Sequence, residues 1–514
     1  MKKILKVLFS RLFIIGFLIV LQFLMLLMVI YHLSENYIYI SLGINLLGVI
    51  FLLVIINKTN QAPSTKIPWI MIVTLLPLGC VIYALFGIHM VLSNRNKKKF
   101  HTLTNVVARY YFEKNECIGE LEKIDYGLAN QSRFIKNTSD CPLHHNTRVK
   151  YLASGEETFT LMLEKLKEAK YFIFLEYFII EKGKFWDSIL EILIDKAANG
   201  VDVRVMYDDV GSIGTLPGKY YKKLEKKGIK CLAFNKFIPI VSAMHNNRDH
   251  RKIMIIDGDI AFNGGINLAD EYINEKKRFG HWKDSCVYLY GEAVKTFTTM
   301  FLENWNVFCK TDEDYDKFMP KYYENKEYDS DGFVQPFGDG PRPIYDEHVG
   351  EGVYLNIINN AKKYLYITTP YLVIDYHIIQ ALRLAALRGV DVRIITPHIP
   401  DKRIVFWLTR SNYLTLVQAG VKIYEYTPGF IHAKTFVCDD KVGVVGTINL
   451  DYRSLSHHFE CATWIAGSSC IEDIKTDFLQ TMMISTEIDL KKCKKLSYPA
   501  KFLSSILGIF APLF

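Results

Sequence analysis

The sequence predicts a membrane-anchored α/β protein, with N-terminal transmembrane helices followed by two duplicated α/β halves packed around one active site. Three observations support this prediction. Long apolar runs lie mainly in the first part of the chain, a strand–helix–strand pattern occurs twice, and one spaced set of polar residues recurs in both copies. A chain of 514 residues is long enough for two or three folding units.

Three apolar runs open the chain, and each matches the roughly 20 residues that a helix needs to cross a bilayer. They cover residues 12–31, 37–56 and 68–90. A cleaved signal peptide is the alternative for the first run, but no small-residue cleavage site follows it and a second run comes almost at once. We therefore expect residues 1–95 to form a transmembrane anchor of two to three helices in the cell membrane.

The charges that flank these runs leave the orientation in the membrane open. With the N-terminus inside, six Lys and Arg residues lie on one side and four on the other, which hardly satisfies the positive-inside rule. Ten cysteines without CxxC pairs favour free thiols in a reducing compartment, and hence a cytoplasmic catalytic face. The net charge of +8 suits an anionic partner, either nucleic acid or acidic lipid.

The remainder of the chain contains the same order of elements twice. Residues 171–180 read as a buried strand, a helical pattern follows and stops at Gly200, and residues 201–207 form the next strand. The order recurs with strands at 364–372 and 390–396, and the tetrapeptide VDVR opens the later strand of both copies. Helices between strands imply crossover connections within a mainly parallel or mixed sheet.

The two copies define the domain boundaries. We place the first half at residues 145–310 and the second at 344–490, separated by an acidic linker with Gly and Pro at 311–343. The last segment, 491–514, begins with a basic cluster and ends in an apolar stretch that is too short to cross a bilayer. A basic amphipathic tail of this kind is typical of an interfacial membrane anchor.

One spaced pattern occurs in each half: Lys, Asp, Gly and Asn follow a histidine by 2, 7, 14 and 17 residues. The two copies are His250, Lys252, Asp257, Gly264 and Asn267, and His432, Lys434, Asp439, Gly446 and Asn449. We expect the His, Lys and Asp of each copy to be catalytic residues and the Asn to bind phosphate. A further His-x-Lys, formed by His281 and Lys283, lacks the later residues, so the short pattern alone carries little information. Chance does not explain the full pattern at equivalent places in a duplicated fold.

The pattern has a physical interpretation. Residues two apart in a strand share a face, so each His and Lys point the same way, and the Asp offers a turn that returns the chain beside them. Two such faces would gather two His, two Lys and two Asn around one point. Lysine and asparagine would hold the oxygens of a phosphodiester, while one imidazole attacks phosphorus and the other protonates the leaving alkoxide. No cofactor or divalent metal is needed.

These motifs resemble those of the phospholipase D superfamily, whose halves carry the same pattern. The resemblance implies a covalent phosphohistidine intermediate, which water or an alcohol then releases. It also implies that Asp284 and Glu460 orient the histidines, that His250 is the nucleophile and that His432 is the acid. The sequence itself leaves the reverse assignment of the two histidines open. Thr447 departs from the family, which usually has Ser or Gly there.

The resemblance narrows to the cardiolipin synthases and covers roughly residues 65–514. It includes the segments YDDVGSIG, RDHRKIMIIDG, GGINLADEY and GFIHAKTFVCDD. Such enzymes join two phosphatidylglycerol molecules into cardiolipin and release glycerol. The resemblance thus implies phosphatidylglycerol and anionic membrane lipid as partners, and no nucleic acid. The commonest pattern in the family has two spans rather than three.

Three other functions share some of these features. A phospholipase would use the same site with water as acceptor, a nuclease would act on nucleic acid, and a membrane scaffold would have no activity. The apolar spans argue against a nuclease, and two complete motifs argue against a scaffold. The CDP-alcohol transferases make the same lipid but need a DGxxAR signature, which all three Asp-Gly pairs of this chain lack.

Two further polar features have less specific interpretations. Adjacent histidines at 144–145 and 457–458 could suggest a metal site, but neighbouring imidazoles usually cannot converge on one ion, so we expect ordinary surface or packing roles. Two aspartates at 208–209 follow a strand, where α/β proteins place functional loops. A solvated pair at the strand end is an equal alternative.

Overall fold

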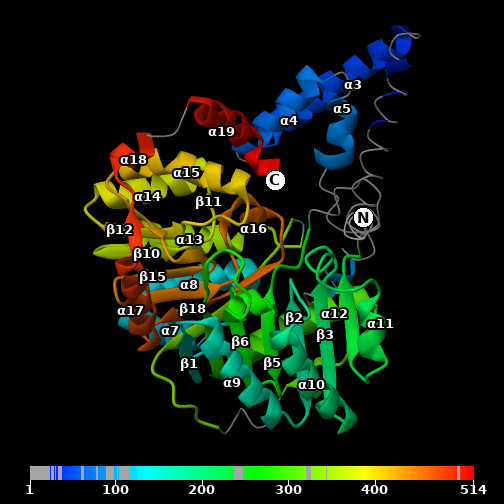
Figure 1. Ribbon diagram of the computed structural model, residues 1–514, viewed down its shortest axis with the longest axis vertical. Coiled ribbons are helices and arrows are strands. Elements are labelled where there is room, and N and C mark those ends of the chain that lie inside the picture. Colours follow the sequence, from blue (N-terminus) through cyan, green and yellow to red (C-terminus); the bar gives the residue numbers. More distant parts are fainter. Residues whose placement is uncertain are drawn as a thin grey trace.

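The computed structural model describes residues 24, 28, 31–32, 38–58, 63–76, 79–87, 98–100, 102–103, 116–236, 247–319, 326–342, 344–494 and 498–513. Two sheet-containing halves lie side by side, and the N-terminal helices project from one end of the molecule (Figure 1). The helices α7 (Glu116–Ile124) and α8 (Tyr126–Ser139) lie directly before the first strand.

The first half is built on a mixed seven-stranded sheet in the order β1-β8-β6-β5-β2-β3-β4. β2, β3 and β4 pair in parallel, and the other strands continue the sheet with antiparallel pairs. The strands are β1 (Thr147–Leu152), β2 (Phe172–Tyr177), β3 (Asp202–Asp208), β4 (Lys230–Phe234), β5 (Lys252–Ile256), β6 (Ile260–Gly264) and β8 (Cys286–Gly291). The helices are α9 (Gly155–Glu168), α10 (Lys184–Ala198), α11 (Tyr220–Glu225), η3 (Asp270–Ile273), α12 (Val294–Cys309) and η4 (Tyr315–Phe318).

The second half has an eight-stranded sheet in the order β19-β13-β12-β10-β15-β16-β18-β9. Its strands are β9 (Phe333–Asp339), β10 (Tyr364–Thr368), β12 (Asp391–Pro397), β13 (Lys422–Tyr426), β15 (Thr435–Cys438), β16 (Val442–Gly446), β18 (Glu460–Ala466) and β19 (Ser485–Glu487). Its helices are α13 (Val349–Asn360), α14 (Tyr376–Leu387), α15 (Arg403–Val417), α16 (Tyr452–Ser456), α17 (Cys470–Met483), α18 (Leu490–Lys494), α19 (Tyr498–Phe510) and η6 (Ala511–Leu513). Short pairs join β11 (Leu372–Val373) to β17 (Leu450–Asp451), and β14 (Gly429–Ile431) to β7 (His281–Lys283).

The two sheets confirm the predicted duplication. Read from β9, the second sheet runs β9-β18-β16-β15-β10-β12-β13, which matches β1-β8-β6-β5-β2-β3-β4 strand for strand. The last three residues of each VDVR open β3 and β12, the equivalent strands of the two sheets. β6 faces β18 across the interface, where the Asn263 side chain bonds the Cys461 sulfur and the Thr463 hydroxyl, at 3.1 and 3.2 Å. One buried apolar cluster therefore includes residues of both halves.

The predicted linker at 311–343 differs from the structure, because it contains the buried edge strand β9. β9 is the counterpart of β1, so the second half begins before residue 344. Pro336 and Gly338 suggested a loop, but an edge strand tolerates a proline because one side of it needs no donor for a neighbouring strand.

The N-terminal region contains α3 (Ile38–Asn57), α4 (Pro63–Leu75), α5 (Gly79–Ile82) and the π-helical turn η1 (Tyr83–Gly87). The predicted run 12–31 lies almost entirely outside the described residues, and the run 68–90 is divided between α4, α5 and η1. Among the residues that the structure describes, no helix meets both the length and the apolar content required to cross a membrane.

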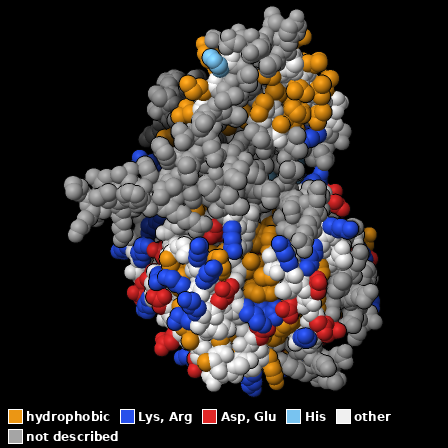
Figure 2. Space-filling model, turned by 90° about the vertical axis from the view of Figure 1, so that its right-hand side faces the viewer, with side chains coloured by type: hydrophobic (Ala, Val, Ile, Leu, Met, Phe, Trp, Pro, Cys, Tyr) orange, Lys and Arg blue, Asp and Glu red, His pale blue; other side chains and the backbone are white. Residues whose placement is uncertain are grey.

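Exposed apolar side chains gather on the N-terminal helices, at the top of the molecule (Figure 2). They come mainly from α3 and include Leu42, Leu46, Ile50, Leu53 and Ile56. The C-terminal helix α19 lies between these helices and α15 (Figure 1), where its end packs against Leu408. The predicted amphipathic tail thus connects the second half to the N-terminal region.

Candidate functional site

The two halves fix the backbones of the two motif histidines through reciprocal hydrogen bonds. His250 lies just before β5, and its N–H donates to the carbonyl of Phe459 at 2.9 Å. His432 lies between β14 and β15, and its N–H donates to the carbonyl of Lys283 at 2.7 Å. Each histidine is therefore anchored to the opposite half, at the residue just before a buried carboxylate.

The histidine rings make a matching pair of contacts with those carboxylates. His250 Nδ1 lies 3.0 Å from Glu460 Oε2, and His432 Nδ1 lies 2.7 Å from Asp284 Oδ2. Both carboxylates are completely buried. A carboxylate at Nδ1 holds the proton there and leaves Nε2 free to react, so both rings have the tautomer that nucleophilic or acid–base chemistry needs.

The motif lysines add positive charge to the same buried site. Lys252 and Lys434 each donate to the backbone carbonyl of their own motif histidine, and both are buried. Burial lowers the pKa of Lys252 to about 8 and that of Lys434 to about 7. An anionic ligand would reverse this effect by favouring the charged ammonium groups.

The same environment keeps the histidines neutral. Burial, followed by the charges of Lys252 and Lys434, holds the pKa of His250 well below its usual range. Burial and the charge of Lys434 lower the pKa of His432 to about 4, against the opposing effect of Asp284. Lys252 from the first half and Lys434 from the second thus both lower the pKa of the two motif histidines, so the two motifs form one site.

The motif asparagines have different surroundings. Asn267 donates to the Tyr272 hydroxyl at 2.6 Å and accepts from the N–H of Ile179 at 3.0 Å, and the Tyr272 ring contacts the His432 ring. The buried Asn449 Oδ1 has no hydrogen-bond partner among the described residues. Asn449 therefore has unused hydrogen-bonding capacity, whereas Asn267 is held in place from both sides.

The residues at the same position of the two motifs, Gly265 and Thr447, enclose the carboxylates. A Cβ at Gly265 would collide with Asp284 Oδ1, so only glycine allows this close approach. The Thr447 hydroxyl donates to Glu460 and also accepts from the N–H of Cys461 at 3.1 Å. Thr447, where the family usually has Ser or Gly, thus donates a hydrogen bond directly to Glu460, the carboxylate that contacts His250.

The motif aspartates lie elsewhere. Asp257 accepts hydrogen bonds at 2.7–2.9 Å from the N–H groups of residues 170–172, and Asp439 does the same at 2.7–2.8 Å for residues 362–364. Each aspartate lies at the far end of a strand from its histidine, roughly 20 Å away at the rise of an extended chain. The structure does not bring them into the site, so their expected catalytic place is corrected to a structural one.

Replacing these aspartates should therefore affect stability before chemistry. We expect Asp257→Asn and Asp439→Asn each to lower the free energy of unfolding by about 1–3 kcal/mol, because backbone N–H groups lose an ionised acceptor. Asparagine tolerates the positive φ angles of 53° and 55° at these positions, so backbone strain does not confound the result. Denaturant unfolding followed by circular dichroism measures the change. Unchanged stability with abolished turnover would contradict this assignment.

His458 is a site residue that the sequence interpretation missed. Its ring centroid lies 5.5 Å from that of His250, and its Nδ1 lies 3.6 Å from Glu460 Oε1. Neither ring nitrogen has a hydrogen-bond partner among the described residues, and burial lowers the pKa of His458 to about 3. The sequence signal for His458 was its place two residues before Glu460, the predicted histidine-orienting carboxylate. Both side chains lie at the same end of β18, and the fold brings that end to His250.

Aromatic side chains and a buried aspartate complete the surroundings. Phe178 packs against His250, whereas Trp282 and Phe430 pack against His432. Asp208 is completely buried and accepts from the N–H of Asp249 at 3.1 Å, so it supports the segment that leads into His250. The solvated alternative for Asp208 is therefore wrong.

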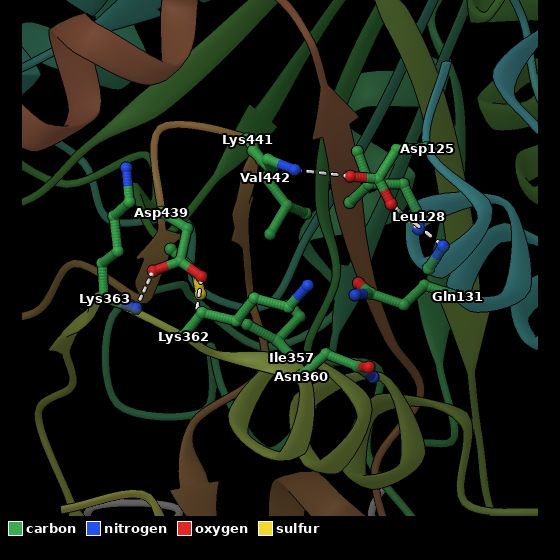
Figure 3. A pocket seen from close by; sticks show the side chains of 12 residues that line it. Asp125, Leu128, Gln131, Ile357, Asn360, Lys362, Lys363, Asp439, Lys441 and Val442 are labelled. Atoms are coloured by element: carbon green, nitrogen blue, oxygen red, sulfur yellow. Dashed lines mark hydrogen bonds and ion pairs between the residues drawn. The ribbon is translucent and has the colours of Figure 1, made fainter. Parts of the chain in front are cut away.

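A separate cavity of about 310 Å³ lies at the Asp439 end of the second half. Figure 3 shows Asp439 bonded to the backbone N–H groups of Lys362 and Lys363, and Lys441 paired with Asp125 at 2.6 Å. None of the motif histidines or lysines lines this cavity. The cavity is thus distinct from the candidate active site.

Comparisons with known proteins identify the family of this chain. The family model "Cardiolipin synthase, PLD-like domain" matches residues 162–305 and 354–482, and "Phospholipase_D-nuclease N-terminal" matches residues 46–87. A cardiolipin synthase of Halalkalibacterium halodurans is 33% identical over 473 residues, covering 90% of this chain and 92% of that protein. An uncharacterized protein of Streptococcus mutans is 43% identical over 448 residues, covering 87% of this chain and 96% of that protein.

A solved structure supports the fold. The crystal structure of phosphatidylserine synthase from Haemophilus influenzae aligns with a TM-score of 0.54 at 15% identity, covering 75% of this chain and 98% of that one. At this identity the likeness concerns the fold alone. With the two matched domains and the 33% identity to a cardiolipin synthase, the chain belongs to the cardiolipin synthase family and is a phosphatidyltransferase of the phospholipase D type.

Proposed function

We propose that this enzyme is a cardiolipin synthase, which transfers a phosphatidyl group from one phosphatidylglycerol to a second and releases glycerol. The observation that carries the proposal is the pair of crossed histidine–carboxylate contacts, with both motif lysines in the same buried site. Membership of the cardiolipin synthase family supports the choice of lipid.

In the first step, His250 Nε2 attacks phosphorus, and the bond from phosphorus to the glycerol oxygen breaks. His432 donates a proton to that oxygen, so glycerol leaves and a phosphatidyl-histidine remains. The negative charge of the bound phosphodiester raises the pKa of His432, which lets a ring that is neutral in the free enzyme carry this proton.

In the second step, a hydroxyl of another phosphatidylglycerol transfers its proton to His432 and attacks phosphorus. The phosphorus–nitrogen bond breaks, cardiolipin forms, and His250 returns to its starting state. Lys252, Lys434 and the motif asparagines Asn267 and Asn449 hold the phosphoryl oxygens as charge develops on them. Glu460 and Asp284 keep the two rings in their reactive tautomers.

We further propose that residues 1–95 anchor the enzyme in the cell membrane, with the C-terminal tail at the interface. The exposed apolar side chains of α3 would be costly in water and suit a hydrocarbon environment. All ten cysteines are free, which fits a catalytic face on the cytoplasmic side. An anchor of this kind would hold the site close to its lipid substrates.

The proposed function is tested by the products formed from labelled phosphatidylglycerol. Purified full-length enzyme in detergent micelles should form cardiolipin and glycerol in equal amounts, and added glycerol should drive the reaction backwards. The measurement is the ratio of cardiolipin to phosphatidate, resolved by chromatography across a range of lipid concentrations. Phosphatidate as the main product at every concentration would identify a phospholipase instead.

A further inference from the structure

A second arrangement of ligand atoms overlaps the first histidine. His250, His458 and Glu460 each offer one atom that can bind a metal, and these three atoms lie within 4.8 Å of one another. His250 Nδ1 is 2.9 Å, and His458 Nδ1 3.6 Å, from the same oxygen, Glu460 Oε1. Two imidazole nitrogens therefore converge on one carboxylate oxygen in a buried site.

Hydrogen bonding accounts for the approach of His250 to Glu460 but not for that of His458. A distance of 3.6 Å between His458 Nδ1 and Glu460 Oε1 is too long for a hydrogen bond. Both ring nitrogens of His458 are buried and have no hydrogen-bond partner among the described residues, whereas Glu460 Oε1 lies within hydrogen-bonding distance of His250 Nδ1, at 2.9 Å. Buried polar atoms without partners are uncommon, and an ion bound by His250, His458 and Glu460 together would give His458 Nδ1 a partner.

We propose that His250, His458 and Glu460 form an inhibitory binding site for Zn²⁺. Two imidazoles and one carboxylate form a ligand set that Zn²⁺ prefers, with a fourth position left for water or a phosphate oxygen. Mg²⁺ prefers six oxygen ligands and does not fit this site. Inhibition rests on the proposed function, because the bound metal occupies the histidine that must attack phosphorus.

The mode of inhibition follows from the contacts. Zn²⁺ would take the place of the proton between His250 Nδ1 and Glu460, and that proton would move to Nε2 of the same ring, which then has no lone pair with which to attack phosphorus. The ring would then carry the charge of the metal and would lose the carboxylate that makes it nucleophilic. The metal is thus an inhibitor of this reaction and not one of its cofactors.

The other half of the molecule provides an internal comparison. Trp282 precedes Asp284 by two residues, as His458 precedes Glu460, and its ring lies 5.5 Å from His432. The His458 ring lies at the same distance from His250. Because an indole does not bind Zn²⁺, only one of the two motif histidines, His250, has such a ligand set beside it among the described residues.

The inhibition test uses full-length enzyme in detergent micelles and compares Zn²⁺ with Mg²⁺. Zn²⁺ should inhibit cardiolipin formation and EDTA should restore it, whereas Mg²⁺ at equal concentrations should not inhibit. EDTA should not lower the activity of the zinc-free enzyme. The Mg²⁺ series separates occupation of the site from general effects of cations on acidic lipid. Equal inhibition by both ions would overturn the proposal.

Matched variants locate the site. In His458→Asn, the Zn²⁺ concentration for half-inhibition should rise by about tenfold or more, because loss of an outer-shell partner alone costs a metal site about 10- to 100-fold. Each variant is scaled to its own zinc-free activity. The control is His457→Asn, which changes the neighbouring imidazole and should keep the wild-type sensitivity. Unchanged sensitivity in folded His458→Asn would overturn the proposal.

A binding measurement separates this proposal from the proposed function. His432→Ala retains all three ligands, so calorimetric titration with zinc chloride should detect one tight site in it, and that site should be lost in His250→Ala. Absence of this site in His432→Ala would overturn the proposal, even where Zn²⁺ inhibits the wild type. Zinc binding by a wild-type protein that makes no cardiolipin would instead overturn only the proposed function.

Discussion

Alanine in place of His250 or His432 is expected to lower cardiolipin formation by about 10³-fold or more, because one ring forms a bond to phosphorus and the other moves a proton. Both side chains occupy buried positions with a carboxylate at Nδ1. The measurement is turnover of labelled phosphatidylglycerol by purified variants whose folding is checked by thermal unfolding. Near-normal turnover in either folded variant would contradict the two-histidine mechanism.

The matched control for this experiment is His281→Ala. His281 begins another His-x-Lys sequence, but it is exposed and its ring bonds the Tyr426 hydroxyl at 2.9 Å. Its replacement should leave most of the turnover intact. Loss of activity in His281→Ala comparable to that in the motif variants would mean that the assay responds to any change in this region.

A lipid with a good leaving group distinguishes the two histidines. With phosphatidyl-p-nitrophenol, departure of nitrophenolate needs no proton, so the nucleophile is required and the acid is not. His432→Ala should release one equivalent of nitrophenolate per enzyme in a burst and then slow down, whereas His250→Ala should give no burst. The opposite result would exchange the roles of the two histidines.

The parts of the fold that follow from local pattern could be predicted from the sequence. The repeated strands and their VDVR residues indicated two equivalent sheets, and the structure has them. The strand β9 escaped prediction because its seven residues include Pro336 and Gly338, which are typical of turns. Its pairing with β18 and its bridge to His144 stabilise it as a strand, and such long-range pairings have no local signal.

In the candidate site, too, local spacing identified some residues, whereas others depend on contacts between distant parts of the chain. The spacing of the motif identified His250 and His432, but it also grouped Asp257 with them, although a strand of that length carries the aspartate to its opposite end. His458 was set aside because adjacent imidazoles rarely share an ion. In the structure its neighbour in the site is His250, which is distant in sequence, and not His457.

The second large effect on turnover is expected from Asp284 and Glu460, the two carboxylates that each contact the motif histidine of the opposite half. We expect Asp284→Asn and Glu460→Gln each to lower turnover by about 10²- to 10⁴-fold, because an amide at Nδ1 can hold the ring in the wrong tautomer while changing its position little. The amide side chains are close in size to the carboxylates, so the core around them should remain packed. Nitrogen NMR of labelled histidine should show the altered tautomer, which a purely structural role would not change.

The burst assay then shows which carboxylate serves which histidine. Because Glu460 contacts His250, Glu460→Gln should resemble His250→Ala and give no burst with phosphatidyl-p-nitrophenol. Asp284 contacts His432, so Asp284→Asn should retain the burst and lose only the later turnover. If each carboxylate served the histidine of its own half, the two variants would behave in the opposite way. The crossed arrangement makes the two halves chemically inseparable, since each reactive ring depends on a carboxylate that the other half supplies.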